Sequence, residues 1–211
     1  MPSPKWLGVS VSMQSSIATA ITITALTKAN PGVATATNTF TNGDYVKIRA
    51  QGMTQVDNRV FRVAGVTGTT FQLEGEDTSL YTTFVSGTVE KLTLGTSFST
   101  LKTVSGSGGE FDKIDATTIH DVTKKQEFGF SSAIEFSFDS FWDIADVALV
   151  AAIAASKLAA DRAFLFGFAT GQKMVFSGTV AASGIPTGST GEKVTTKLSI
   201  SATGVPTYYA T

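Results

Sequence analysis

The stretch that decides the fold is residues 128–138, which read FGFSSAIEFSF. Its large apolar side chains all fall at even positions, namely Phe128, Phe130, Ile134, Phe136 and Phe138. An alternation of period two is typical of a β-strand with one buried face. Burying a phenylalanine contributes about 1.5–3 kcal/mol. We therefore expect one long strand whose even positions face a core and whose odd positions, small or acidic, face away.

The residues after this strand predict one helix, a hairpin and a last strand. Ser140 stands three residues before Asp143, which resembles a capping box with Asp in place of Glu, and apolar residues follow at helical spacing. We expect a helix over 141–158. Alternating large apolar residues on both sides of a glycine turn predict a hairpin over 164–180. Residues 194–202 alternate again, with apolar residues at even positions.

The first half of the chain has a different texture. Residues 21–92 contain short β-like runs closed by turn-forming residues, which predicts a compact β module close to the lower size at which a domain folds alone. In one run Val46 and Ile48 alternate with Tyr45, Lys47 and Arg49, as expected of a strand with one wet face. We expect this module to be inserted between residues 1–20, which read as a strand or arm, and residues 93–211.

A polar segment follows the module. Residues 105–109 read SGSGG, which favours a flexible hinge, and residues 102–126 hold few apolar anchors. His120 stands beside Asp121, but no nucleophile or second ligand accompanies it in a recognisable pattern. Asp112, Asp115 and Asp121 lack the spacing of a calcium loop. A mobile, solvated loop is the better interpretation than a catalytic or metal site.

Composition favours an assembly subunit. Charged residues make up 16% of the 211 residues, below the roughly 25% of typical soluble domains, and interface cores are depleted in Lys and Glu. The net charge of -1 leaves no basic excess to hold phosphates. The absence of cysteine excludes disulfides and thiolate chemistry. We expect no cofactor and no membrane association, because the apolar region 144–155 is shorter than the roughly 20 residues of a membrane span.

Part of the module resembles a small β-barrel-like module that recurs in phage structural proteins. The likeness to this module, first recognised through a half-domain of ubiquitin-activating enzymes, covers Thr24 to Val89 and rests on residues 28–31, 42–48, 58–63 and 70–73. It implies a fold only, because a chain without cysteine cannot carry that enzyme's chemistry.

The second half resembles the tail tube proteins of long-tailed bacteriophages. The likeness covers Glu110 to Tyr209: an Asp-x-Thr segment at 115–118, the long strand, one helix, a Phe-rich strand into Gly171, and a last strand ending at 201–206. It implies a mainly β fold, a β-sandwich with one flanking helix, whose six-membered rings stack into a virion tail tube made in the host cytoplasm. It further implies as partners the tape measure protein, the tail terminator, tail-tip proteins and transient DNA in the lumen.

These expectations assign residues to two surfaces and no catalytic role. The odd positions of the two long strands are expected to face the lumen: Ser131, Ala133, Glu135, Ser137, Thr195, Lys197, Ser199 and Ser201. We expect Lys197 to pair with an acidic neighbour such as Glu135. An inter-ring loop is expected to include Lys102, Gly108, Gly109, Asp112, Asp115, His120 and Asp121.

Two other functions stay open. A tail-tip, decoration or adhesin protein would use the module to bind a host glycan, which needs exposed aromatic side chains, and the module holds only Tyr45 and Tyr81. A glycan hydrolase would need two facing carboxylates, for which Glu110, Glu127, Glu135 and Asp139 are available.

Overall fold

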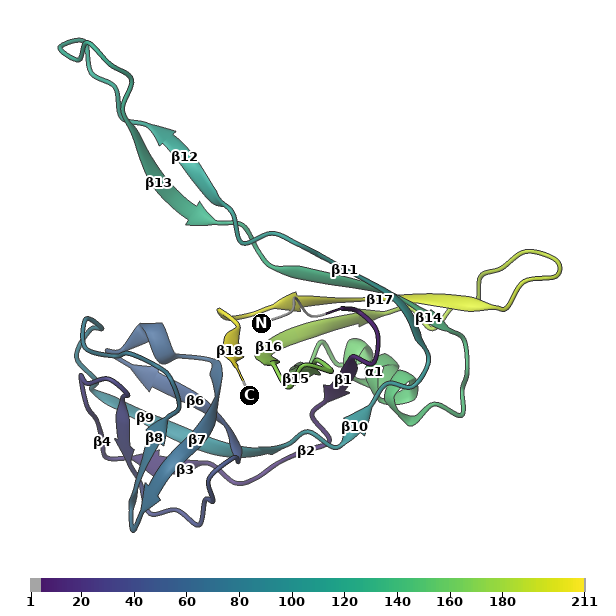
Figure 1. The fold of residues 1–211 in the computed structure, drawn as a ribbon, viewed down its shortest axis with the longest axis horizontal. Coiled ribbons are helices and arrows are strands. Elements are labelled where there is room, and N and C mark those ends of the chain that lie inside the picture. Colours follow the sequence, from purple (N-terminus) through teal and green to yellow (C-terminus); the bar gives the residue numbers. More distant parts are fainter. Residues whose placement is uncertain (1–4, 211) are drawn as a thin grey trace.

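The computed structural model describes residues 5–210, which form two β-sheets, a projecting hairpin and one α-helix (Figure 1). This mainly β architecture with a flanking helix confirms the predicted fold class. Both sheets have eight strands, and the one with more residues in its strands is called the larger sheet. The larger sheet has the order β10-β1-β15-β16-β17-β14-β11, and β18 pairs with β16. Its strands are β1 (Ser10–Met13), β10 (Thr96–Ser97), β11 (Leu101–Ser107), β14 (Glu135–Phe141), β15 (Asp161–Gly167), β16 (Lys173–Ala182), β17 (Thr195–Ala202) and β18 (Thr207–Tyr209).

The smaller sheet contains the strands from the first half of the chain. Its order is β2-β9-β6-β7-β8-β5-β4, and β3 pairs with β9. The strands are β2 (Ser16–Ile17), β3 (Ile21–Ile23), β4 (Ala25–Leu26), β5 (Val33–Thr35), β6 (Tyr45–Gln51), β7 (Arg59–Thr67), β8 (Thr70–Leu73) and β9 (Ser86–Thr93). A short 3-10 helix, Thr54–Val56, follows β6. The β-like run expected around Val46 and Ile48 is strand β6.

Aromatic contacts close the larger sheet on itself. Phe136 on β14 lies 4.9 Å from Phe176 on β16 and 5.2 Å from Phe166 on β15, measured between ring centroids. Because β17 and β16 separate β14 from β15 in the sheet, these rings can meet only if the sheet curls around them. The resulting core also takes Leu198 and Ile200 from β17, as their even positions predicted.

The long strand expected over 128–138 is broken, and its first half is not core. The hairpin strand β13 (Gln126–Ser131) ends before β14 begins at Glu135. Phe128 and Phe130 are 77% and 89% exposed. Gly108, at a φ of +90°, marks the break, because a Cβ there would lie 1.9 Å from the Ala133 carbonyl oxygen. The two backbones therefore cross at a glycine, where the chain turns away from the core.

The helix α1 (Val147–Lys157) begins later than expected. Ser140 is a buried residue of β14, so the capping-box prediction was wrong. The cap is Asp146, whose carboxylate accepts hydrogen bonds from the backbone N–H groups of Ala148 and Leu149. Its other oxygen accepts from the Thr100 hydroxyl at 2.8 Å and the Ser99 hydroxyl at 3.0 Å. Asp146 thereby ties the helix to the segment that joins β10 and β11.

The smaller sheet packs on the outward face of β15 and β16. Lys47 is buried and pairs with Asp161 on β15, and its ammonium also donates to the Ser177 hydroxyl at 2.9 Å. The expectation of a wet face on β6 was therefore wrong at Lys47 and in part at Tyr45, which lie against the larger sheet, whereas Arg49 on the same face is exposed. Apolar residues from both sheets surround the contact: Val60, Leu92, Ala163, Val175 and Tyr209.

A second polar contact lies beside β18. The Arg59 guanidinium forms a buried pair with Glu76 and reaches the Thr207 hydroxyl at 3.4 Å. The Tyr209 hydroxyl accepts a hydrogen bond from the Arg62 backbone N–H at 2.6 Å, and burial raises the pKa of this tyrosine. Strand β18 of the larger sheet is thus attached to β7 of the smaller sheet.

Replacing Lys47 tests the attachment of the smaller sheet to β15 and β16 of the larger sheet. Removing one partner of a buried ion pair costs about 3–5 kcal/mol. We expect Lys47→Ala to lie near the lower figure, because Ser177 and Thr203 still donate to Asp161. Lys91→Ala is the control, since its pair with Asp44 at 2.7 Å is more exposed and should contribute less than about 1 kcal/mol. Denaturant unfolding measures both, and equal losses would contradict the assignment.

Asp146 gives the stability of the fold a dependence on pH. Burial alone would raise the pKa of Asp146, but hydrogen bonds from Thr100, Ser99 and the helix N-terminus together lower it. The stabilisation is therefore present above the unfolded pKa, near 3.9, and is lost as the pH falls through the lower folded value. Asp146→Asn should cost about 1–2 kcal/mol at pH 7, and the difference from wild type should shrink below about pH 4.

Thermal unfolding across this pH range measures the effect. Asp143→Asn is the matched control, because Asp143 is exposed in the same segment and should change stability by less than about 0.5 kcal/mol. A cost for Asp146→Asn that does not vary with pH would contradict the role given to the charge.

Candidate functional site

A polar face covers the outward side of β14 and β17. Ser137 lies opposite Ser199 in the antiparallel register, and Glu135 lies opposite Ser201. Ser105 on β11 extends the row, because it pairs with Ser137 on the other side. These side chains alternate with the core residues of the same strands, so the parity that buries the phenylalanines turns the hydroxyl groups outward.

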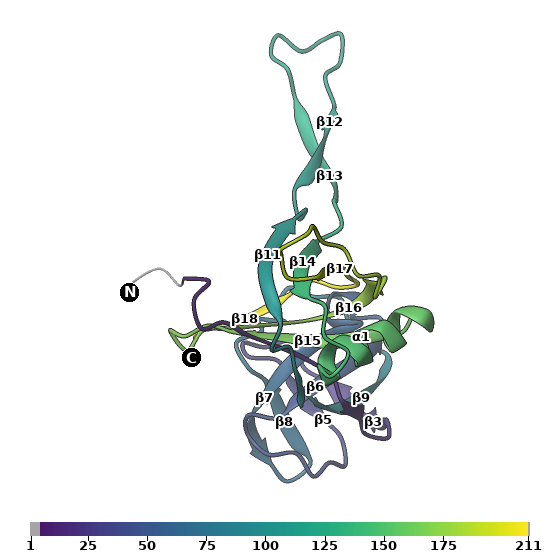
Figure 2. The same cartoon turned by 90° about the vertical axis from the view of Figure 1, so that its right-hand side faces the viewer.

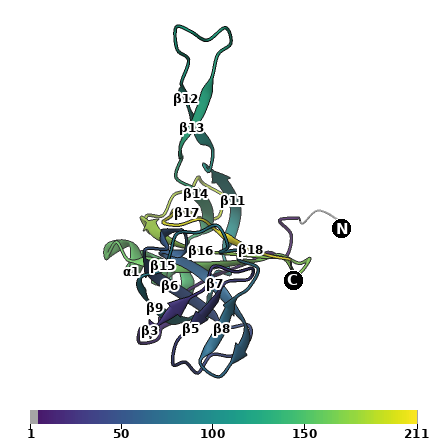
Figure 3. The same cartoon turned by 90° about the vertical axis from the view of Figure 1, so that its left-hand side faces the viewer.

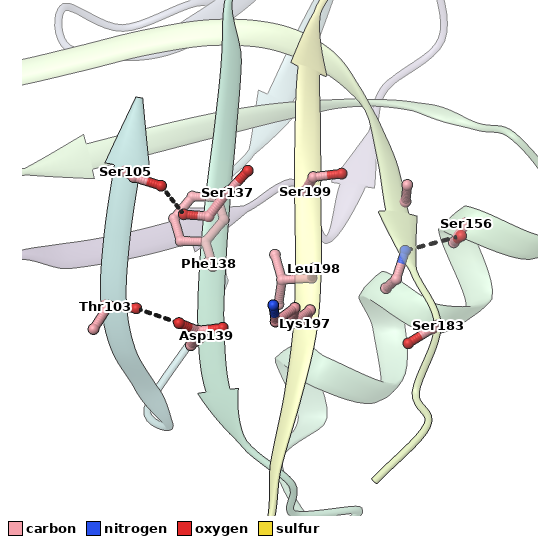
Figure 4. A pocket seen from close by; sticks show the side chains of 12 residues that line it. Thr103, Ser105, Ser137, Phe138, Asp139, Ser156, Ser183, Lys197, Leu198 and Ser199 are labelled. Atoms are coloured by element: carbon pink, nitrogen blue, oxygen red, sulfur yellow. Dashed lines mark hydrogen bonds between the residues drawn. The ribbon is translucent and has the colours of Figure 1, made fainter. Parts of the chain in front are cut away.

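The polar face includes a shallow hollow of about 660 Å³ (Figure 4). Its lining is mostly hydroxyl-bearing and small: Thr103, Ser105, Ser137, Phe138, Asp139, Ser156, Ala181, Ala182, Ser183, Lys197, Leu198 and Ser199. The Thr103 hydroxyl donates to Asp139 at 2.9 Å, and the Ser201 hydroxyl donates to Glu135 at 3.0 Å. The face therefore offers hydroxyl groups and nearly balanced charges.

Six of the eight residues expected to face a lumen lie on β14 or β17. Thr195, Lys197, Ser199 and Ser201 follow one another along β17, and Glu135 and Ser137 lie on β14. Ser131 ends β13 in the projecting hairpin, and Ala133 lies in the connection between β13 and β14, so these two are not part of the sheet.

Lys197 was expected to have an acidic neighbour such as Glu135, and the choice of Glu135 was wrong. In the register of the two strands Lys197 lies opposite Asp139, four residues along the strand from Glu135. Thr103 and Ser105 were not expected on this face, because Ser105 was placed in the hinge over 105–109 and Thr103 in the loop over 102–126. The alternation of Thr103, Val104 and Ser105 was the signal that could have identified a strand.

A projecting arm, residues 108–134, extends from the end of β11 and β14 (Figures 2 and 3). Its hairpin pairs β12 (Phe111–Asp115) with β13. The expectation of a loop over 102–126 is corrected in part, because Lys102 belongs to β11, and Asp112 and Asp115 belong to β12. Gly108 and Gly109 form the base of the arm, and His120 and Asp121 lie at its tip.

The acidic residues of the arm stabilise its own turns. Hydrogen bonds from the Thr117 side chain and from the Thr117 backbone N–H, the latter at 2.9 Å, lower the pKa of the Asp115 carboxyl. Asp121 pairs with Lys125, and this contact lowers the pKa of the Asp121 carboxyl. The same carboxylate accepts a hydrogen bond from the Thr118 backbone N–H at 3.0 Å. His120 is exposed. Within residues 5–210 no three acidic or histidine side chains gather where they could hold a metal ion.

Tyr45 and Tyr81, the two tyrosines considered for glycan binding, pack against the core clusters of the protein. Tyr45 contacts the cluster between the two sheets, and burial raises its pKa. Tyr81 packs against the core of the smaller sheet, and its hydroxyl donates to Glu76 at 2.5 Å. Neither ring forms the exposed platform that sugar recognition would need.

The only α-helix in the described part of the chain has eleven residues, and no helix there is long and apolar enough to cross a membrane.

Comparison with known proteins agrees with the resemblance of the second half of the chain. No curated protein matches the chain. A model of the phage tail tube protein family matches residues 51–211. This range includes the arm, the helix, the later strands of the smaller sheet and every strand of the larger sheet apart from β1. Members of this family are structural components of the virion tail that assemble with copies of themselves and with other tail proteins. The chain belongs to the phage tail tube protein family.

Proposed function

We propose that the chain forms stacked rings of six subunits whose lumen conducts DNA during ejection, and that it catalyses no reaction. The polar face of β14 and β17 is the observation that carries this proposal. DNA would be retarded by a basic lining, because Lys and Arg bind phosphates with release of counterions. The face instead presents Lys197 opposite Asp139, with Glu135 farther along β14 opposite Ser201, together with a row of serine hydroxyls.

The free edge of β11 supports closure into a ring. β11 pairs with β14 on one side, and it ends the order of the larger sheet within the described residues. An unpaired strand edge exposes backbone N–H and C=O groups that pair readily with another chain. A neighbouring subunit that adds its sheet to this edge would extend the polar face around a lumen.

The smaller sheet would then lie outside the tube wall. It packs on the outward side of β15 and β16, in the layer across the aromatic core from β14 and β17. If the polar face of β14 and β17 is turned to the lumen, the smaller sheet therefore lies on the side of the subunit that is farther from the lumen. We also propose that residues 21–92 are an insertion, although deleting them would uncover Ala163 and Val175.

The arm would reach a subunit of an adjacent ring, and the finished tube would meet the tape measure protein, the tail terminator and tail-tip proteins. The arm supports the first of these contacts, because it projects away from both sheets and Phe111, Phe128 and Phe130 on it are exposed.

Adding positive charge to the polar face tests the conduit. Ser137 and Ser199 form one cross-strand pair, and replacing both by Lys should leave the subunit folded because neither is core. Repeated around the ring, these lysines should slow DNA ejection from phage particles by about tenfold or more at low salt, with recovery at high salt.

The control places two lysines on exposed turns of the smaller sheet, Thr41→Lys with Thr69→Lys. This variant should eject DNA at the wild-type rate. Wild-type ejection by the Ser137/Ser199 variant, in tails of normal length, would contradict the proposal.

A further inference from the structure

The helix α1 is apolar on two sides. Its inner side packs on the larger sheet through Ala148, Leu149, Ala152 and Ala155. Its outer side carries a second apolar stripe at positions 147, 150, 154 and 158. Val147, Val150 and Leu158 in this stripe are 75%, 47% and 75% exposed. A helix that is apolar all round is typical of a protein interior, so the outer stripe is expected to be covered in the working state.

The arm carries the second uncovered apolar surface. Phe128 and Phe130 project from the same side of β13, and Phe111 joins them from β12 with its ring 6.0 Å from that of Phe128. All three are exposed. A two-stranded hairpin is marginally stable by itself. Exposed apolar patches mark contact sites, so we expect a partner that covers the three phenylalanines and stabilises the hairpin. Nothing else in residues 5–210 covers them.

The two surfaces cannot meet within one chain. The arm leaves one end of the larger sheet and projects away from the body, whereas α1 lies against the body near the other end (Figures 1 and 2). They are also different surfaces, so a contact between them joins two copies head to tail and repeats from copy to copy. Such a repeating contact is what a growing tube requires.

We propose that the phenylalanine side of the arm packs on the outer stripe of α1 in a second copy of the chain. This inference rests on the proposed tube assembly and specifies which surfaces of the two subunits meet. It makes α1 an assembly element and gives the exposed phenylalanines of the arm their partner.

Cysteine crosslinking tests the contact directly, because the chain has no cysteine of its own. Tails isolated from particles that carry Phe128→Cys with Val150→Cys should give a ladder of disulfide-linked multimers on oxidation. Phe128→Cys with Thr41→Cys, a site on the smaller sheet, is the matched control and should stay monomeric. Tails that assemble but give no ladder, or in which the cysteine introduced on the arm links to another tail protein, overturn the inference and leave the proposed tube intact.

Charge exchange keeps the test decisive if the cysteine variants assemble poorly. Phe130→Glu and Val150→Lys should each reduce tube assembly at least tenfold without lowering the melting temperature of the monomer, because both sites are exposed there. The double variant should restore assembly. No rescue overturns the contact, and a wild-type chain that never assembles overturns the proposed function as well.

Discussion

The contact of Phe136 with Phe166 and Phe176 is the interaction on which the rest of the structure depends. It joins strands that are not neighbours and so curls the larger sheet around one aromatic core. Side chains alternate along a strand, so burying one set on each strand turns the other set outward. Which side chains face the aromatic core therefore determines three surfaces. These are the polar face, the surface on which the smaller sheet packs and the surface on which α1 packs.

The outward side of the curled sheet is divided by chemistry. On β15 and β16 it is apolar around one buried ion pair, Lys47 with Asp161, and another sheet covers it. On β14 and β17 it is lined by serine and by few, nearly balanced charges, and it stays open. A buried pair contributes specificity of docking more than stability, which suits a module held in one orientation. An open hydroxyl-rich face suits a surface past which a polyanion moves.

Sequence periodicity predicted those parts of the fold in which neighbours along the chain are also neighbours in the sheet. Thr196, Leu198 and Ile200 on β17 have the predicted parity for this reason, whereas Val194, which precedes the strand, is exposed. The same rule failed at Phe128, because the alternation continues in the sequence across a break where Gly108 lets the backbones cross. Lys47 was placed in water because its partner is more than a hundred residues away. The start of the helix was missed because the capping signal at Ser140 looks equivalent to that at Asp146 until the tertiary hydrogen bonds of Asp146 are known.

The orientation of the subunit in the tube is the central claim, and a cryo-electron microscopy reconstruction of isolated tails measures it most directly. The account predicts that β11, β14 and β17 surround the lumen with their serine side inward and that the smaller sheet lies on the outer wall. A lumen lined by the smaller sheet, or a serine face turned to the outside of the tube, would contradict it.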